Sequence, residues 1–346
     1  MDDRFGILER LASGVVVGDG GYLLELEHRG YVQAGPYTPE VVLEHPDAVR
    51  QLHREFRQAG SEVLQALTFY AADDKLQPRW GSRMTDEVNR AAVRLAREVA
   101  CPDALVSGTV TQTTTYVPGD PASDRRAGVS FARQLDAQCD EGVDFVIAET
   151  FRYLGEARLA LAAIVERGVP AMITLNVGPR GTGDGVDGPE CARTLAGEGA
   201  AIVGVNCNWD PDMSLRVAAA MRAAVPAGAY VACQPVGFRT ADPARPFTAL
   251  EEFPLSLERL QLTRFDLARF AREAADAGIG YIGGCCGVGA YHVRAMAEAL
   301  GRHPPASEKS PDLSRHVLPD VQARALPPPE PATLCGRIDE SAVQVP

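Results

Sequence analysis

The chain has 346 residues, of which 46% are hydrophobic and 23% are charged, and its formal net charge is -12. This composition is typical of a soluble globular protein, and the length predicts either two domains or one large α/β unit. The acidic balance argues against a nucleic-acid backbone or an anionic membrane surface as a partner, because both are negatively charged. We find no secretory signal pattern and no apolar run of membrane-spanning length, so we expect a cytoplasmic protein that does not bind membranes.

Eight short runs rich in β-forming residues recur along the chain, and each is followed by a stretch with apolar residues at helical spacing. Runs that are apolar on both faces and separated by helices are typical of a parallel sheet. Eight of them predict a closed (β/α)8 barrel, the TIM-barrel fold. The runs cover residues 14–22, 61–69, 103–111, 143–151, 170–177, 200–207, 230–237 and 279–286.

The composition changes after about residue 303, where Pro and Ser become frequent and helical periodicity fades. We therefore predict that residues 1–303 form the barrel and that residues 304–346 form an extended, irregular, Pro-rich tail.

Chemically active side chains follow the ends of several predicted strands, where barrel enzymes build their active sites. A separate core or surface role is the alternative for each of them, but three cysteines at the same end of two strands disfavour it. The other cysteines are scattered, which fits reduced thiols better than a disulfide framework. The strand-end candidates are Asp19, Thr68, Phe69, Tyr70, Glu149, Cys207, Cys285 and Cys286.

The adjacent pair Cys285 and Cys286 lies among glycines, which permit the backbone bend that two neighbouring thiols need to reach one target. Three interpretations compete: small apolar core residues, a strained disulfide between neighbours, or two ligands of a soft metal ion. If the pair binds metal, Cys207 is the natural third ligand. Three thiolates with an open fourth position are typical of catalytic zinc, and such a zinc prefers a sulfur atom of the substrate.

Residues 14 to about 303 resemble the zinc-dependent homocysteine S-methyltransferase family. The segments GVNCNWDP and YIGGCCGVGAYHVRAMAE carry the pattern of the wider family, whereas GDGGYLLELEHRGYVQAGPYTPE and TFYAADDKL resemble its betaine-dependent branch. The resemblance implies an enzyme that moves a methyl group from betaine to the thiolate of homocysteine, giving methionine and dimethylglycine.

The same resemblance implies one zinc per chain on Cys207, Cys285 and Cys286. It also implies that Asp19 and Glu149 bind the homocysteine ammonium group. Charge supports this independently, because two carboxylates at strand ends need a cation or must shift their pKa values.

A quaternary ammonium donor must be recognised by aromatic faces, since it has no hydrogen to donate. The resemblance places Tyr37 and Tyr70 at donor-binding positions, with Thr68 and Phe69 beside Tyr70, although Phe69 could instead belong to the core. His316, in a segment that faintly matches the family's dimerisation arm, corresponds to a position near the donor.

The sequence departs from this family in three places. Thr150 replaces a tyrosine that lines the donor site, Trp209 replaces a smaller aromatic residue, and the dimerisation arm is shortened. Trp209 could rebuild part of the pocket or could be a structural residue. We still expect a homo-oligomer.

Two other functions remain open on the sequence alone. One is a homocysteine S-methyltransferase that uses a sulfonium donor, such as S-methylmethionine or dimethylsulfoniopropionate, or another betaine. The other is a non-catalytic zinc-binding barrel, which the two carboxylates disfavour because a structural zinc needs no ammonium site.

Overall fold

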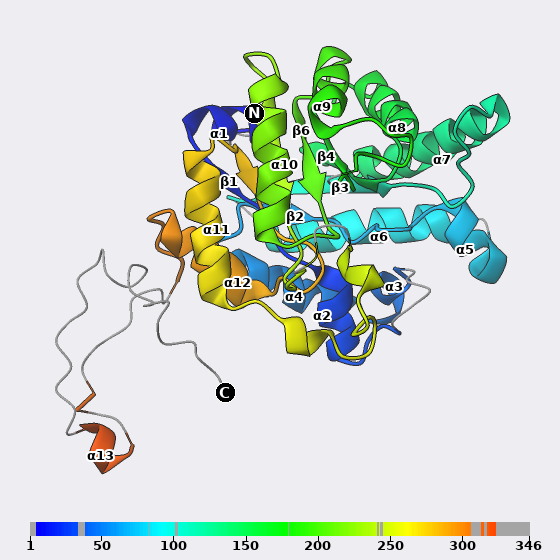
Figure 1. Cartoon of the computed structure of the whole chain (residues 1–346). Helices are drawn as coiled ribbons and strands as arrows, with labels where there is room; N and C mark the ends of the chain where they lie inside the picture. Colours follow the sequence, from blue (N-terminus) through cyan, green and yellow to red (C-terminus); the bar gives the residue numbers. More distant parts are fainter. Residues whose placement is uncertain are drawn as a thin grey trace.

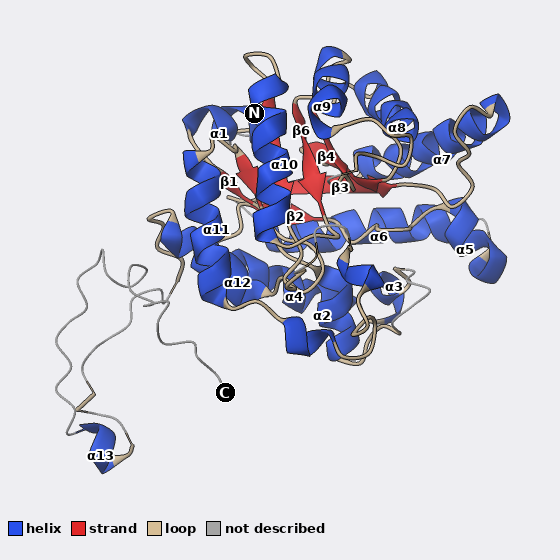
Figure 2. Ribbon diagram, in the orientation of Figure 1, coloured by secondary structure: helices blue, strands red, loops and turns tan. Residues whose placement is uncertain are grey.

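Eight parallel strands form one sheet in the computed structural model of the chain, in the order β1-β8-β7-β6-β5-β4-β3-β2. Helices surround this sheet on the outside (Figures 1 and 2). The predicted TIM barrel is confirmed, and each strand lies within the run predicted for it. The strands are β1 (Val16–Val17), β2 (Val63–Gln65), β3 (Leu105–Thr111), β4 (Phe145–Phe151), β5 (Ala171–Leu175), β6 (Ile202–Asn206), β7 (Tyr230–Gln234) and β8 (Tyr281–Ile282).

The structure describes residues 5–33, 39–81, 83–100, 103–178, 180–240, 242, 245–305, 313–314 and 317–322. Its α-helices are α1 (Ile7–Ser13), α2 (Tyr22–His28), α3 (Val41–Glu44), α4 (Pro46–Gln58), α5 (Asp73–Trp80), α6 (Arg83–Ala100), α7 (Pro121–Asp140), α8 (Leu154–Glu166), α9 (Gly188–Gly197), α10 (Pro211–Ala224), α11 (Arg264–Asp276), α12 (Ala290–Ala299) and α13 (Pro319–Gln322). Two 3-10 turns, Phe247–Ala249 and Leu257–Leu260, lie between β7 and α11.

Several outer helices begin at sequence signals that fix their first turn. Asp120, Asp187 and Asp210 each accept a hydrogen bond from a backbone N–H of the following helix, and a proline lies in the first turn of all three helices. Thr263 and Asp266 form a reciprocal capping box at the start of α11. Such caps satisfy N–H groups that have no partner within the helix.

A separate hydrophobic cluster fills the barrel interior. Strand residues such as Phe145, Met172 and Tyr281 pack there against Ile7 and Leu11 of α1. Helix α1 therefore packs against this interior cluster. The candidate site residues lie at the carboxyl ends of the strands, as in other barrels of this type.

Strands β1 and β2 stand at the two ends of the strand order, and the barrel closes along the seam between them. Carboxylate side chains contribute hydrogen bonds across this seam. Glu62 N–H donates to the Val17 carbonyl at 2.8 Å, and Val17 N–H donates to the Glu62 carboxylate at 2.8 Å. Arg302 contacts both Glu62 and the Val15 carbonyl. Further along the seam, Gln65 N–H donates to the Asp19 carboxylate at 2.7 Å.

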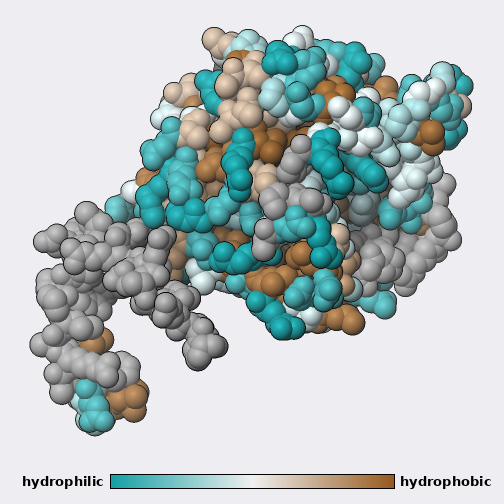
Figure 3. All heavy atoms as spheres, viewed as in Figure 1, coloured by the Kyte–Doolittle hydropathy of each residue, from teal (hydrophilic) through white to brown (hydrophobic). Residues whose placement is uncertain are grey.

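The outer surface mixes hydrophilic and hydrophobic side chains on the face shown in Figure 3. Across the part of the chain that the structure describes, we find no helix with both the length and the hydropathy needed to cross a bilayer. Most of the predicted tail lies outside the described residues, so the division at residue 303 and the tail's role in oligomerisation stay predictions.

Substituting Glu62 by Ala should destabilise the barrel, because Val17 N–H and Arg302 both lose their carboxylate partner. The expected loss is about 1–3 kcal/mol, measured as a lower midpoint of thermal or urea unfolding. Glu87→Ala is the control: Glu87 forms an exposed ion pair with Arg83, which should contribute less than about 1 kcal/mol. Equal stability of the two variants would contradict a role for Glu62 in closing the seam.

Candidate active site at the carboxyl end of the barrel

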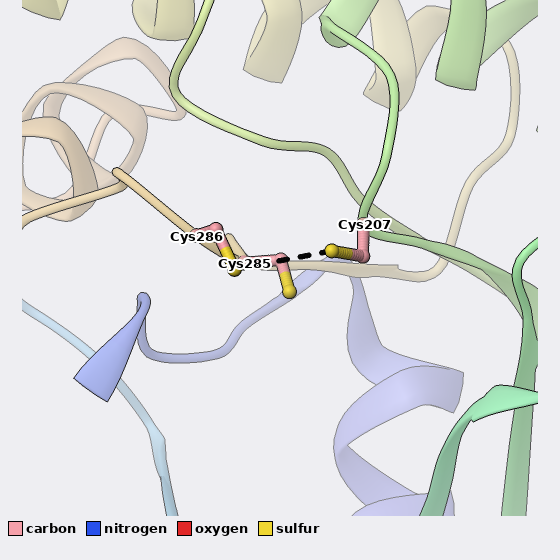
Figure 4. A group of neighbouring side chains, drawn as sticks. All are labelled: Cys207, Cys285 and Cys286. Atoms are coloured by element: carbon pink, nitrogen blue, oxygen red, sulfur yellow. Dashed lines mark hydrogen bonds between the residues drawn. The ribbon is translucent and has the colours of Figure 1, made fainter. Parts of the chain in front are cut away.

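Three cysteine sulfurs converge at the carboxyl end of the barrel (Figure 4). Cys207 directly follows β6, whereas Cys285 and Cys286 lie in the turn after β8. The three Sγ atoms all lie within 4.8 Å of one another, and those of Cys207 and Cys286 are 3.9 Å apart. Within the described ranges, no other group of three His, Cys, Asp or Glu side chains is clustered for a metal ion in this way.

Local backbone turns bring these thiols together. Cys207 and Asn208 both have left-handed φ angles, 63° and 64°, which turn the chain directly after β6. In the second turn, Val288 N–H donates to the Cys285 carbonyl at 3.0 Å, and Gly287 has a φ of 78°. The bend predicted at the cysteine pair is therefore present.

Close packing of glycine also holds the second turn in place. A Cβ atom on Gly21 would lie 2.5 Å from the Cys285 carbonyl oxygen, so only glycine allows the segment after β1 to approach this turn.

The electrostatics of the sulfur cluster favour a bound cation. Hydrogen bonds with Cys285 and Cys286, together with burial, raise the pKa of the Cys207 thiol. Hydrogen bonds from Cys207 and Cys285 lower the pKa of Cys286, which makes that sulfur the favoured thiolate. Three soft ligands within reach of one point have the chemistry and spacing of a metal-ion site, and a metal would replace the thiol protons.

Apolar side chains cover the sulfur cluster. Phe238 and Phe247 stack with ring centroids 5.6 Å apart, and Phe253 packs edge-on against Phe247 at 5.6 Å. Cys207 belongs to this cluster, and Cys285 and Cys286 pack against it. The cover limits the access of water to the sulfurs and lowers the local dielectric, which strengthens the interactions of charged groups there.

Two carboxyl groups lie beside the sulfurs, and Gln65 connects them. The Gln65 backbone N–H donates to Asp19 Oδ2 at 2.7 Å, while its side-chain Nε2 donates to Glu149 Oε1 at 2.7 Å. Asn206 Nδ2 donates to the other oxygen of Glu149, Oε2, at 3.2 Å. The hydrogen bonds therefore fix the orientation of both carboxyl groups.

Both carboxyl groups are buried, Asp19 at 1% and Glu149 at 7% exposure. Burial raises the pKa of Asp19 to about 7. Burial raises the pKa of Glu149 well above its usual value, because it disfavours the charged form. Neither group has an ion-pair partner among the described residues, so a bound cation would stabilise both as carboxylates.

A cavity joins the three sulfurs to the Glu149 carboxyl group. All three cysteines line it, together with Glu149, Gln65, Tyr22 and Phe69. Asp19 is not among the residues that line it, and Gln65 links Asp19 to Glu149.

Tyr70 lies next to this site in a left-handed conformation, with a φ of 61°. Its ring is 4.3 Å from that of Phe69, centroid to centroid, and its side chain hydrogen-bonds to Gln112. The ammonium group of Lys75 lies 4.4 Å from the centre of the Tyr70 ring, so this ring already makes one cation–π contact.

Thr150 has a φ of 63°, which is rare for a β-branched residue. Two hydrogen bonds with Asn206 hold it there: Thr150 N–H donates to Asn206 Oδ1, and Asn206 Nδ2 donates to Thr150 Oγ1, both at 2.8 Å. Thr150 thus shares Asn206 with Glu149, which couples this position to the carboxylate site.

The remaining predicted site residues are placed differently. Thr68 is not among the cavity-lining residues, and its hydroxyl donates to the Thr109 carbonyl at 2.7 Å. The indole of Trp209 packs over Gly178, where an added Cβ would lie 2.3 Å from the ring. Tyr37 and His316 lie outside the described residues, so their roles stay predictions.

Sequence reasoning did not single out Gln65, Asn206 or Tyr22. Gln65 ends β2, and Asn206 ends β6 immediately before Cys207. For Gln65 and Asn206, the signal in the sequence was a polar side chain at the end of an otherwise apolar strand. The same signal identified Glu149.

The family model for homocysteine S-methyltransferase matches residues 16–300. The chain is 46% identical over 339 residues to betaine–homocysteine S-methyltransferase 1 of Mus musculus, covering 92% of this chain and 83% of the relative. It is 48% identical over 337 residues to the protein of the same name from Danio rerio, covering 92% and 84%. The chain therefore belongs to the homocysteine S-methyltransferase family, which confirms the resemblance found in the sequence.

Two further similarities bear on the donor and on the fold. An S-methylmethionine–homocysteine S-methyltransferase of Pongo abelii is 46% identical over 334 residues, covering 92% of this chain and 90% of the relative. The metallated form of the homocysteine methyltransferase MmuM from Escherichia coli has the same fold, with a TM-score of 0.68 at 18% identity, covering 84% of this chain and 98% of that one.

Replacing Cys207, Cys285 or Cys286 singly with Ala should remove most of the bound metal, because two thiolates are a poor site for a soft cation. Metal content of the purified variants, measured by mass spectrometry, checks this. Cys139→Ala is the matched control, since Cys139 lies on the outer helix α7. Full metal retention in Cys207→Ala would exclude Cys207 as a ligand.

Proposed function

We propose that this protein is a methyltransferase that transfers a methyl group from betaine to homocysteine, giving methionine and dimethylglycine. The observation that carries the proposal is one cavity lined by three converging thiols and by a buried carboxyl group linked to a second one. This pairing matches a substrate with sulfur at one end and an ammonium group at the other. The relatives at 46–48% identity named for betaine support the donor.

The metal is proposed to be zinc, one per chain, held by Cys207, Cys285 and Cys286. Three thiol ligands fit zinc better than harder cations, which prefer oxygen. When bound, zinc would supply a Lewis acid that keeps the homocysteine sulfur deprotonated at neutral pH.

The residues of the chain supply binding and orientation. Asp19 and Glu149 would pair with the homocysteine ammonium group, with Gln65 and Asn206 holding the two carboxylates in place. The aromatic cluster around Phe247 packs against the cysteines and would limit the access of water to their sulfurs. Transfer from a cation to a thiolate neutralises both charges, so such a dry site favours the reaction, and fixed positions for both reactants add to this effect.

A sulfonium donor is the second candidate function. The relative from Pongo abelii named for S-methylmethionine is as similar to this chain as the mouse relative named for betaine. Thr150 stands where the resemblance to the betaine-dependent branch implies a tyrosine, and this difference would change the shape of the donor side. A direct comparison of the two donors in an activity assay is therefore needed to decide between them.

The function is tested with zinc-loaded protein, homocysteine and one donor at a time: betaine, S-methylmethionine or dimethylsulfoniopropionate. We expect methionine to form fastest with betaine, together with an equal amount of dimethylglycine. Faster turnover with a sulfonium would transfer the proposal to that donor. No methionine from any of the three would refute the proposed reaction.

Tyr70→Ala should weaken donor binding about tenfold or more, since a cation–π contact in a desolvated site contributes about 1–2 kcal/mol. The KM for homocysteine should change little. Tyr70→Phe, which keeps the aromatic face and removes only the hydroxyl, is the control. A Tyr70→Ala variant with unchanged donor KM would exclude this ring from donor recognition.

A further inference from the structure

A hydrogen-bond network of three buried polar side chains leads away from the carboxylate site. The Tyr22 hydroxyl lies 2.7 Å from Asp19 Oδ2, to which it donates, and 2.8 Å from His53 Nδ1. Asp19, Tyr22 and His53 are 1%, 7% and 0% exposed. Tyr22 begins α2 and His53 lies within α4, so the hydrogen-bond network connects an outer helix to the cavity.

The number of protons available to these three side chains determines which group donates in each hydrogen bond of the network. A tyrosine hydroxyl has one proton, so when it donates to Asp19 it must accept from His53, whose proton then lies on Nδ1. Burial lowers the pKa of His53 to about 3, so the ring is neutral. His53 Nε2 is buried with no hydrogen-bond partner among the described residues, which fits a nitrogen without a proton.

The opposite arrangement needs a neutral Asp19. A protonated Asp19 could donate to the Tyr22 oxygen, and Tyr22 would then donate to His53 Nδ1, leaving the His53 proton on Nε2. In that state Nε2 would be a buried donor without a partner, which is costly. The tautomer of His53 therefore reports whether Asp19 is charged.

We propose that Tyr22 and His53 form a buried donor chain that orients the Asp19 carboxylate for the ammonium group of homocysteine, which makes Tyr22 a positioning residue for the substrate. The proposal rests on the proposed function. Tyr22 O–H and Gln65 N–H both donate to Oδ2, and the Asp19 backbone N–H also donates to the carboxylate. Since a carboxylate has about four acceptor positions, one is left for the ammonium group.

The tyrosine ring is held independently of its hydroxyl. Its centroid lies 5.0 Å from that of His53 and 5.1 Å from that of Phe56. Tyr22→Phe should therefore keep the packing and remove only the hydrogen bond. Tyr281→Phe is a matched control, because Tyr281 is fully buried near Asp19 but its hydroxyl has no partner among the described residues.

The test compares binding of homocysteine and of 4-mercaptobutanoate, which keeps the thiol and carboxylate but lacks the amine, to zinc-loaded protein by calorimetry. Tyr22→Phe should raise the Kd of homocysteine about tenfold or more, as expected for loss of a hydrogen bond to a charged group, and should leave that of the analogue unchanged. Tyr281→Phe should change neither.

A spectroscopic readout complements the binding data. In protein with 15N-labelled histidine, homocysteine should fix His53 as the Nδ1–H tautomer, and the analogue should not. Equal weakening of both ligands by Tyr22→Phe, or a wild-type preference for homocysteine that survives this substitution, would overturn the positioning role alone. If wild-type protein binds both ligands equally, the ammonium site at Asp19 is overturned as well.

Discussion

The architecture depends on the buried carboxylate of Asp19, at the seam between β1 and β2. Its side chain accepts the Gln65 N–H of β2, and its backbone carbonyl accepts the Gly284 N–H at 2.8 Å in the segment that carries the cysteine pair. One residue thus links the closure of the barrel to the position of the sulfurs. Because burial disfavours the charge of Asp19, a bound cation would stabilise the carboxylate there.

The sulfur cluster and the two buried carboxyl groups consequently form one unit. Gln65 contacts both carboxyl groups, and Asn206 connects Glu149 and Thr150 while preceding Cys207 in the chain. A substrate whose thiol and amine are a fixed number of bonds apart would be recognised by this spacing. The left-handed backbone at Tyr70, Thr150 and Cys207 lies in the same region, as is usual where function rather than stability determines conformation.

The strands and the cysteine cluster could be predicted because their signals are local. Apolar runs followed by helical periodicity marked all eight strands, and glycines beside Cys285 and Cys286 marked the bend. The partners of the carboxylates could not be predicted in the same way, since the contact between Tyr22 and His53 depends on how α2 packs against α4. Likewise, nothing in the sequence indicated that Lys75 would lie over the Tyr70 ring, or that Trp209 would pack against Gly178.

The central claim is that three cysteines hold one zinc with a position open for the sulfur of homocysteine. X-ray absorption at the zinc edge tests it most directly, by counting sulfur neighbours with and without substrate. The account predicts three sulfur neighbours in the free protein and a fourth on addition of homocysteine. Four sulfurs before homocysteine is added, or a spectrum that homocysteine leaves unchanged, would contradict it.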